Sequence, residues 1–275
     1  MRKFLGHKMK SFFQRRNRNK TGPLYDVTVF GKTDVGKVRP QNEDCYKIIA
    51  GKDAPDGVDA VMIVADGMGG HAAGEIASGI AVDGVIRRLT DGSTHSTKFG
   101  QKYLQYLEQV LCDVNEEVHI ASKTPKFRGM GTTCTVGVLK GSDLYIVHVG
   151  DSRAYLMQSG KLIQVTKDHS WISEQVEAGN ISADEAKKHP YRNVVTRSIG
   201  TDGYVKVDSL TQNISTGNRI LLCSDGLHSV VADSAIGEVL NQGTVEESCN
   251  CLVELANVNG GPDNITVLVA HLVDM

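Results

Sequence analysis

The sequence predicts an α+β fold, a four-layer α-β-β-α sandwich in which two antiparallel β-sheets stack and helix pairs cover their outer faces. Three observations predict it: strand-like apolar runs follow one another instead of alternating with helices, polar four-residue links join neighbouring runs, and helical stripes come in pairs. The 275 residues are 40% apolar and 23% charged, which suits a globular protein with a large core. That composition excludes collagen-like, disordered and disulfide-scaffold classes, and the chain lacks the internal repeat of a solenoid or propeller.

The first half of the domain begins with strands and continues with helices. Strands are expected at 27–30, 45–49 and 61–65. Two helices follow, because apolar residues recur at helical spacing over 76–89 and again over 99–121, with Pro125 just beyond the second stripe. Both stripes are expected to face the core.

The second half returns to strands. The first four are expected at 132–139, 144–149, 154–157 and 162–165. Lys-Gly-Ser-Asp and Gln-Ser-Gly-Lys separate them pairwise and predict two hairpins. The polar stretch 166–200 contains two short helical pieces and is expected to lie over a surface as an insertion. The remaining elements are strands at 205–210, 219–223 and 265–270, with two helices at about 233–257 before the last strand.

The charge of the chain is divided unevenly. Residues 1–20 carry eight Lys or Arg and no Asp or Glu, which leaves 22 basic against all 32 acidic side chains for the rest. Because the rest of the chain carries this excess of acidic side chains, it is not expected to bind nucleic acid. Residues 1–22 are interpreted as a solvated basic extension, with weak contact to a membrane surface or a partner as the alternative, and 23–275 as one catalytic domain.

The chain carries no secretory or membrane-spanning segment that the sequence reveals. The basic extension lacks the apolar stretch and cleavage site of a signal peptide, and no apolar run approaches ~18 residues. The six cysteines lie at no metal-type spacing and are interpreted as reduced core thiols. We therefore expect a cytoplasmic protein, and we expect it to be a monomer.

Two glycine-rich segments nearly match nucleotide-binding motifs. Residues 31–38 approach a phosphate-binding P-loop, but the last position lacks the required Ser or Thr, and Pro40 obstructs the helix that must begin there. Residues 67–72 match a dinucleotide fingerprint, but Asp66 would repel the pyrophosphate, and 82–89 is helical where a second strand is needed. Neither segment supports nucleotide binding.

Four aspartates lie at the ends of apolar strand-like runs, beside small residues. They are Asp66, Asp151 and Asp225, which follow such runs, and Asp263, which precedes one. Singly, such an aspartate is typical of a turn. Together at one rim of a sheet stack, the carboxylates would raise one another's pKa values, so the group is expected to bind cations. Oxygen ligands favour Mg²⁺ or Mn²⁺ over Zn²⁺, and Gly67, which has no Cβ, would let a backbone carbonyl approach such an ion.

Six motifs in a fixed order carry a family resemblance. They are Arg39-Pro-Gln-Asn-Glu43-Asp44, the ten residues from Ala65 to Gly74, Gly131-Thr-Thr, Val149-Gly-Asp-Ser-Arg153, Ser224-Asp-Gly-Leu227 and Gly261-Pro-Asp-Asn264. Together they resemble the metal-dependent serine/threonine protein phosphatases, the PPM or type-2C family, in their bacterial form. The resemblance runs from about residue 25 to residue 271. It implies the stacked-sheet fold and hydrolysis of phosphoserine and phosphothreonine in proteins, in opposition to a bacterial serine/threonine kinase.

The resemblance also implies a metal-binding role for each matching residue. Asp66 would bridge two Mn²⁺ or Mg²⁺ ions, and the Gly67 carbonyl would bind one of them. Asp225 and Asp263 would complete the other ion, and Asp151, with Asp225, would hold a third.

Further residues would act around these ions. The resemblance implies that Glu43 and Asp44 bind metal-coordinated waters, that Arg39 grips the phosphate and that 166–200 forms a flap beside the site. Two ions about 3.5–4 Å apart would convert a bridging water into the hydroxide that attacks phosphorus in line. Arg39 would offset the developing charge with a bidentate fork.

One position departs from the family pattern. Eukaryotic members carry a histidine directly after the Asp-Gly pair, as a candidate general acid, whereas this chain has Met68. His71 is explained as well by packing of the following helix, so no general acid is assigned. His148 is expected in the core, while His169 and His189 lie in the expected flap, within reach of a substrate.

Two other classes of function stay open on the sequence alone. One is a binding module that keeps the fold and recognises phosphoproteins without hydrolysing them; such a module usually lacks a metal carboxylate, and none is missing here. The other is a nucleotide-binding enzyme, which rests on the two glycine-rich segments. Hydrolysis of p-nitrophenyl phosphate with and without Mn²⁺ separates these classes.

Overall fold

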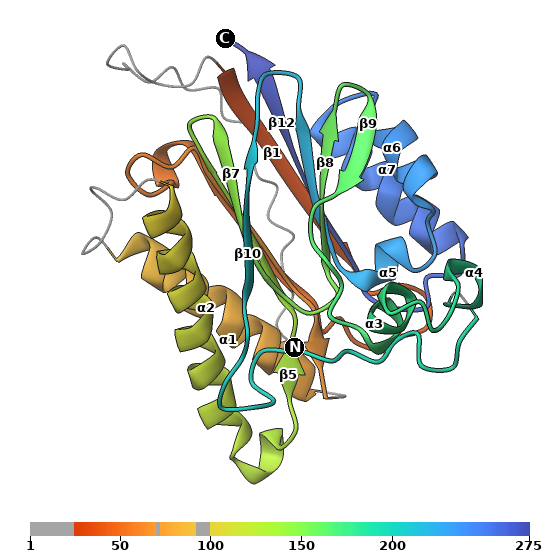
Figure 1. Ribbon diagram of the computed structural model, residues 1–275. Coiled ribbons are helices and arrows are strands. Elements are labelled where there is room, and N and C mark those ends of the chain that lie inside the picture. The colour runs from red at the N-terminus through yellow and green to blue at the C-terminus, as the bar shows by residue number, and fades with distance from the viewer. Residues whose placement is uncertain (1–24, 70–71, 92–99, 187) are drawn as a thin grey trace.

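Two five-stranded antiparallel sheets stack face to face in the computed structural model, which describes residues 25–69, 72–91, 100–186 and 188–275 (Figure 1). Sheet I has the strand order β1-β12-β11-β8-β9, with bounds Tyr25–Asp34, Ile265–Asp274, Arg219–Cys223, Arg153–Gln158 and Lys161–Gln164. Sheet II has the order β10-β7-β6-β3-β2, with bounds Asp208–Asn213, Asp143–Val149, Cys134–Lys140, Ala60–Ala65 and Cys45–Ala50.

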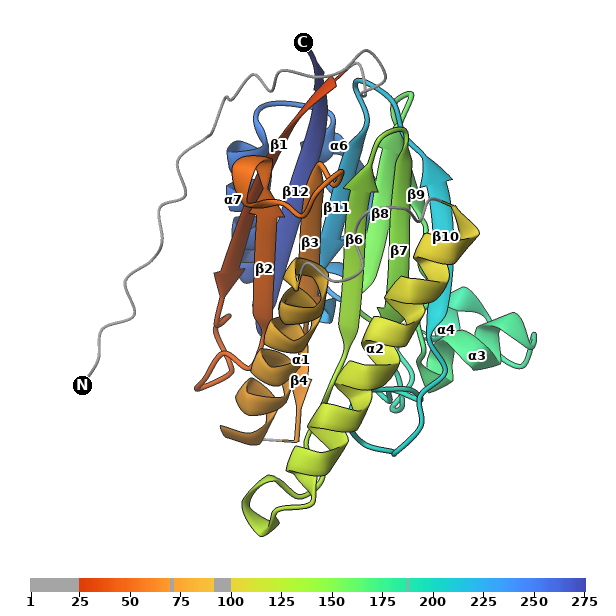
Figure 2. The same cartoon turned by 90° about the vertical axis from the view of Figure 1, so that its left-hand side faces the viewer.

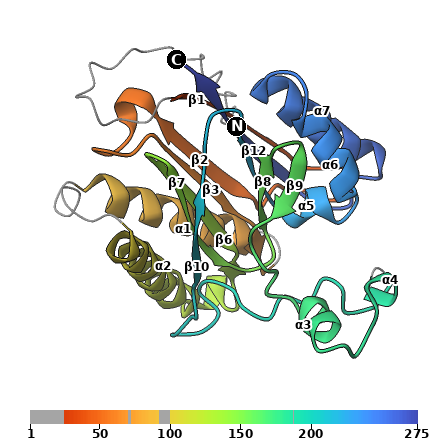
Figure 3. The ribbon, with the colours of Figure 1, turned by 45° about the horizontal axis from the view of Figure 1, so that its top comes forward.

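Helix pairs cover both outer faces of this stack. Helices α1 (Ala72–Thr90) and α2 (Gln101–Ser122) pack on sheet II, as Figure 2 shows. Helices α6 (Asp233–Leu240) and α7 (Val245–Val258) pack on sheet I, on the opposite side in Figure 3. The predicted four-layer fold is confirmed.

Each sheet contributes side chains to two hydrophobic cores, because the side chains of a strand alternate between its two faces. In β3, Val61 and Ile63 pack toward α1 and α2, whereas Met62 and Val64 pack between the sheets. In β11 the alternation separates the inter-sheet core from the core beneath α6 and α7. Successive side chains of a strand point to opposite faces, so strands covered on both faces are apolar throughout. The six residues of β3 are all buried.

The two predicted hairpins are confirmed, and between them the chain changes sheets. β6 pairs with β7 in sheet II, and β8 pairs with β9 in sheet I. The crossover is the tripeptide Gly150-Asp151-Ser152. Gly150 has φ +116°, and a Cβ there would lie 2.5 Å from the Cβ of Thr133, so only glycine fits this turn. The change of sheets therefore places Asp151 between the ends of both.

Several element boundaries differ from the sequence prediction. The strand expected at 132–139 is divided into β5 (Gly131–Thr132), which pairs with β4 (Gly67–Met68), and β6. The strand expected at 205–210 begins only at Asp208; Val205, just before it, is buried in the core beneath α1 and α2, which accounts for the misleading apolar pattern.

The remaining elements are short. A helical turn, α5 (Asp225–His228), was not predicted, and the insertion 166–200 contains α3 (Trp171–Glu177) and α4 (Ala183–Ala186), as predicted. The 3₁₀ turns are Gly51–Asp53 and Pro125–Phe127. The first residue of the second predicted helical stripe, Phe99, lies outside the described residues.

Other expectations have mixed outcomes. The six cysteines are all free thiols, although Cys251 is exposed and only three of the six are buried. In the described part of the chain no helix has the length and apolar character needed to cross a membrane. The basic extension 1–22 lies outside the described residues.

Candidate functional site

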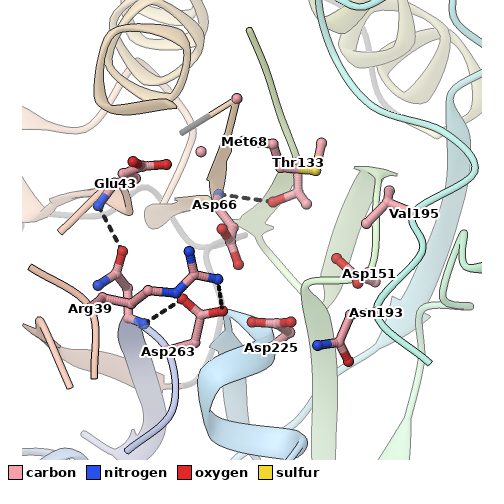
Figure 4. A pocket seen from close by; sticks show the side chains of 13 residues that line it. Arg39, Glu43, Asp66, Met68, Thr133, Asp151, Asn193, Val195, Asp225 and Asp263 are labelled. Carbon is pink, nitrogen blue, oxygen red and sulfur yellow. Dashed lines mark hydrogen bonds and ion pairs between the residues drawn. The ribbon is translucent and has the colours of Figure 1, made fainter. Parts of the chain in front are cut away.

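The four predicted aspartates meet in one pocket at one end of the stacked sheets. Its cavity measures about 220 Å³, and Figure 4 shows carboxylates from both sheets pointing into it. The lining residues are Arg39, Glu43, Asp66, Gly67, Met68, Gly69, Thr133, Asp151, Asn193, Val195, Asp225, Asp263 and Asn264. Asp66 directly follows β3 of sheet II. In sheet I, Asp225 follows β11 and Asp263 precedes β12. Asp151 lies in the crossover between the sheets.

Asp66 is held by its backbone at the end of β3. Its N–H donates to Oγ1 of Thr133 over 2.9 Å, and its carbonyl accepts from the N–H of Thr133 and the hydroxyl of Thr132, each over 2.9 Å. Burial raises the pKa of the Asp66 carboxyl well above its ordinary value, and the charges of Asp44 and Asp225 raise it further.

Asp225 and Asp151 show the same electrostatic strain. Burial raises the pKa of Asp225 to about 6, with Asp263 as the next cause. Burial raises the pKa of Asp151 to about 8, and the charge of Asp225 adds to it. The Asp151 carbonyl lies 3.0 Å from Nε2 of His228, which fixes its backbone from the side of α5.

Asp44 directly follows the pocket residue Glu43 and is half-buried. One of its carboxylate oxygens, Oδ2, accepts from the hydroxyls of Ser224 (2.7 Å) and Thr266 (2.6 Å). Burial nevertheless raises the pKa of Asp44 to about 7. Glu43 lines the pocket, and its N–H donates to Oδ1 of Asn264 over 2.8 Å.

Arg39 and Asp263 form an ion pair with each other. Nη2 of Arg39 lies 2.7 Å from Oδ2 of Asp263, and the Arg39 side chain is 51% exposed. The structure thus brings the predicted phosphate ligand and a predicted metal ligand together. Asn264 fixes this corner, because its amide donates to the carbonyls of Val35 and Gln41, each over 2.9 Å.

Gly67 is required for close backbone packing. A Cβ at this position would lie 2.3 Å from the carbonyl oxygen of Gly74 and 2.6 Å from that of Glu43. No side chain fits between these two backbone segments. Met68, beside it, lines the pocket and carries no proton that it can donate.

The donor set fits hard divalent cations. Among the described buried side chains, Oδ1 of Asp44 and Oδ1 of Asp225 have no hydrogen-bond partner. Buried carboxylates without partners are costly unless a cation balances them. As they stand, no three His, Cys, Asp or Glu side chains of the described residues are gathered closely enough to hold an ion.

The described histidines of the prediction are structural. His148 is buried, with Nδ1 2.8 Å from the Thr135 hydroxyl, as expected of a core residue. His169 is also buried, so it does not face a substrate, and His189 stacks on Trp171 at 4.8 Å. His71 lies outside the described residues. The flap reaches the pocket through two other residues, Asn193 and Val195.

Several site residues received no role in the sequence analysis, although Thr133 and Ser224 lie within its motifs. Thr133 joins the Asp66 segment to the crossover, because its hydroxyl lies 2.7 Å from that of Ser152. Ser224 and Thr266 hold Asp44, and Asn193 lines the pocket. Ser224 directly precedes Asp225, so the position beside a motif aspartate was the available indication.

Comparison with known proteins gives consistent similarities. Residues 42–255 match the family model described as protein phosphatase 2C. The chain is 38% identical over 244 residues to serine/threonine phosphatase Stp of Listeria monocytogenes, covering 87% of this chain and 94% of the relative.

Solved structures show the same similarity. The serine/threonine phosphatase PstP of Mycobacterium tuberculosis superposes with a TM-score of 0.79 at 36% identity, over 90% of this chain and 99% of that one. A structure of the PstP catalytic domain in complex with two manganese ions gives a TM-score of 0.77 at 36% identity, over 91% of this chain and all of the other.

Proposed function

This chain belongs to the protein phosphatase 2C family and is a metal-dependent serine/threonine protein phosphatase, and from that premise we propose that the carboxylate pocket is its active site. The observation that carries the proposal is the meeting of Asp66, Asp151, Asp225 and Asp263 from four chain segments in one pocket, with a buried Asp225 oxygen that has no partner.

We assign the metal-holding role to these carboxylates. Asp66, which points toward Asp225 and Asp263 in Figure 4, and the neighbouring Gly67 carbonyl would serve the two-ion centre together with these two aspartates. Asp151 and Asp225 would hold a third ion, and Glu43 and Asp44 would bind coordinated waters. Divalent ions held there would supply the Lewis acidity that makes water nucleophilic at neutral pH.

The protein's own groups position the phosphate. Arg39 is half exposed at the rim and is joined to the domain by a single ion pair with Asp263. An exposed pair of this kind is worth at most about 1 kcal/mol, so the guanidinium can turn to a phosphate at little cost. Its planar fork matches two phosphate oxygens and offsets the charge that grows on them as the bond to the serine or threonine oxygen breaks.

We assign no side chain as the donor of the proton that the leaving oxygen receives. Met68 cannot donate, and the described flap residues that line the pocket are Asn193 and Val195. Neither is an acid, so no described flap side chain that lines the pocket can donate this proton.

The test is hydrolysis of a phosphothreonine peptide with Mn²⁺, with Mg²⁺ and with EDTA. We expect turnover with either ion and none with EDTA. The same assay is run on Asp66→Asn, which should be inactive, and on Glu246→Gln, which removes one negative charge at an exposed position on α7 and should keep full turnover. Turnover that persists in EDTA, or binding of the peptide without hydrolysis, would contradict the proposal.

The cellular setting is a finer proposal. We infer that the substrates are phosphorylated by a serine/threonine kinase of the same cell and that the protein acts in the cytoplasm as a monomer. Comparing phosphoproteomes with and without this protein tests the first inference. Substrates that accumulate phosphate only on tyrosine or histidine would contradict it.

A further inference from the structure

The two ends of the flap pair with each other before they reach the pocket. The Thr196 N–H donates to the carbonyl of His169 over 2.8 Å, and the Trp171 N–H donates to that of Val194 over 2.8 Å. Ser170 and Val195 form the antiparallel bridge between these contacts. Because Val195 lines the pocket, this short ribbon carries the flap to the site.

His169, at the start of the ribbon, is hydrogen-bonded to both backbone polar groups of Gly150 in the crossover. Its N–H donates to the Gly150 carbonyl over 2.7 Å, and the Gly150 N–H donates to its ring Nδ1 over 3.0 Å. Gly150 directly precedes Asp151, so one residue, His169, joins the flap ribbon through its carbonyl to the segment that carries a pocket carboxylate.

The far side of the ring faces an acidic residue, although Nε2 of His169 makes no hydrogen bond with the described residues. Nε2 of His169 lies 3.1 Å from Oδ2 of Asp208, whose other oxygen accepts from Nη1 of Arg197 over 2.7 Å. Because Nδ1 accepts the Gly150 N–H, the neutral ring carries its proton on Nε2, facing Asp208. The His169 side chain is fully buried, so the ring is held by its Nδ1 contact with Gly150 and by the packing around it.

We propose that His169 is a positioning residue that fixes the Asp151 carboxylate relative to the flap, and thereby the ion site assigned to Asp151 and Asp225. The inference rests on the proposed function of the pocket. A device of this kind is needed because Asp151 lies among like charges that repel it, chiefly Asp225. Because Gly150 has no side chain to pack, the orientation of its backbone depends on the hydrogen bonds of its N–H and carbonyl groups.

Two isosteric variants separate the two ends of the ring. His169→Asn places an amide oxygen near the Nδ1 position and keeps the acceptor for Gly150, whereas His169→Gln reaches toward the Nε2 position and keeps the contact with Asp208. The readout is Mn²⁺ binding by calorimetry, which does not depend on activity. We expect His169→Gln and His169→Ala to weaken one Mn²⁺ site, the one assigned to Asp151 and Asp225, about tenfold, or about 1.4 kcal/mol, while His169→Asn keeps it. Binding of the other ions is unaffected.

A double-mutant cycle tests whether the effect passes through Asp151. Since coupled residues are not additive, His169→Ala should change Mn²⁺ binding and kcat in the wild-type background and leave both unchanged in the Asp151→Asn background. His148→Asn is the matched control, because this buried histidine lies 4.8 Å from His169, ring to ring, and bonds to Thr135 and Lys167 instead of Gly150. It should lower the melting temperature without changing Mn²⁺ binding.

The failures are distinguishable. Equal Mn²⁺ binding by His169→Asn, His169→Gln and wild type, or additive effects of His169→Ala and Asp151→Asn, would overturn the role of His169 alone. Absence of Mn²⁺-dependent hydrolysis by the wild-type protein would overturn the proposed function of the pocket.

Discussion

Two groups of aspartates stand at the same end of this molecule and differ in how their charge is balanced. At the base of the flap, Asp168 receives a bidentate contact from Arg153, and Asp208 receives one hydrogen bond from Arg197. Burial opposes ionisation of both, but the arginines outweigh it and hold both pKa values below the ordinary range.

In the pocket, Asp66, Asp151 and Asp225 have no such partner among the described residues, and burial with mutual repulsion raises all three pKa values. The difference teaches where the chain supplies its own counter-charge and where it leaves that charge to ions from solution. The flap base is a structural ion-pair network, whereas the pocket carboxylates lack an internal counter-charge, which supports the proposal that cations complete the pocket.

The largest effect is expected from Asp66→Asn, which removes the carboxylate assigned to both core ions. Turnover of a phosphothreonine peptide should fall on the order of 10³-fold, because the electrostatic stabilisation of the transition state is lost. In EDTA the melting temperature should rise, since one of several repelling buried carboxylates is gone. Steady-state kinetics and thermal denaturation check this; Mn²⁺-dependent turnover within tenfold of wild type would remove Asp66 from the site.

Arg153→Met tests the flap base, because it removes the internal counter-charge of Asp168. Both side chains are mostly buried, at 21% and 12% exposed. Leaving Asp168 unpaired should cost about 3 kcal/mol of unfolding free energy, measured by urea denaturation in the presence of Mn²⁺. A loss below 1 kcal/mol would show that the flap base does not depend on this pair.

The pH dependence of stability should differ between the two groups. The pocket carboxyls have raised pKa values, about 6 for Asp225 and about 8 for Asp151, so the folded state holds extra protons above the ordinary carboxyl range. In EDTA their contribution is therefore present at low pH and is lost as pH rises through about 6 to 8. Asp168, with a lowered pKa, contributes stability above its unfolded pKa and loses it only at acid pH.

We accordingly expect the melting temperature in EDTA to fall by about 5 °C between pH 5 and pH 8. Millimolar Mn²⁺ should abolish that fall, because ions that bind only the folded state stabilise it by about 2.7 kcal/mol at a hundredfold excess over Kd. Identical melting curves with EDTA and with Mn²⁺ at pH 8 would mean that the pocket carboxyls are not the source of the dependence.

The smallest effect is expected at the exposed pair Lys167 and Glu177, on the outside of the flap base. Their side chains are 48% and 62% exposed. Lys167→Met should change the unfolding free energy by at most about 0.5 kcal/mol, because water already screens the two charges. A loss as large as that of Arg153→Met would show that burial does not distinguish the two pairs.

The sequence predicted most of what this comparison needs. Each pocket aspartate adjoins an apolar run, and such runs form buried strands, so the four carboxylates could be expected at strand ends. Their meeting at one pocket follows from the stacking of the two sheets. The hairpin turns and helix pairs were also predicted, since they depend on local spacing.

What the sequence did not reveal depends on contacts between distant segments. Thr133 interrupts a strand because its hydroxyl bonds to Asp66, 67 residues away, and Ser152, 19 residues away. The pairing of Arg39 with Asp263 spans 224 residues. Val205 belongs to the helix-covered core without lying in a strand, so its apolar character led to the wrong boundary. Local sequence patterns therefore do not predict these contacts between distant residues.

Calorimetric titration of Mn²⁺ into the EDTA-stripped and dialysed protein at pH 7 tests the central claim most directly. The titration is repeated in two buffers that differ in ionisation enthalpy, so that the heat reports the protons released. Because Asp44 and Asp151 have pKa values of about 7 and 8, the pocket holds protons at this pH that cations must displace. The account predicts at least two bound Mn²⁺ per chain with net proton release, and binding of fewer than two ions, or binding without proton release, would contradict it.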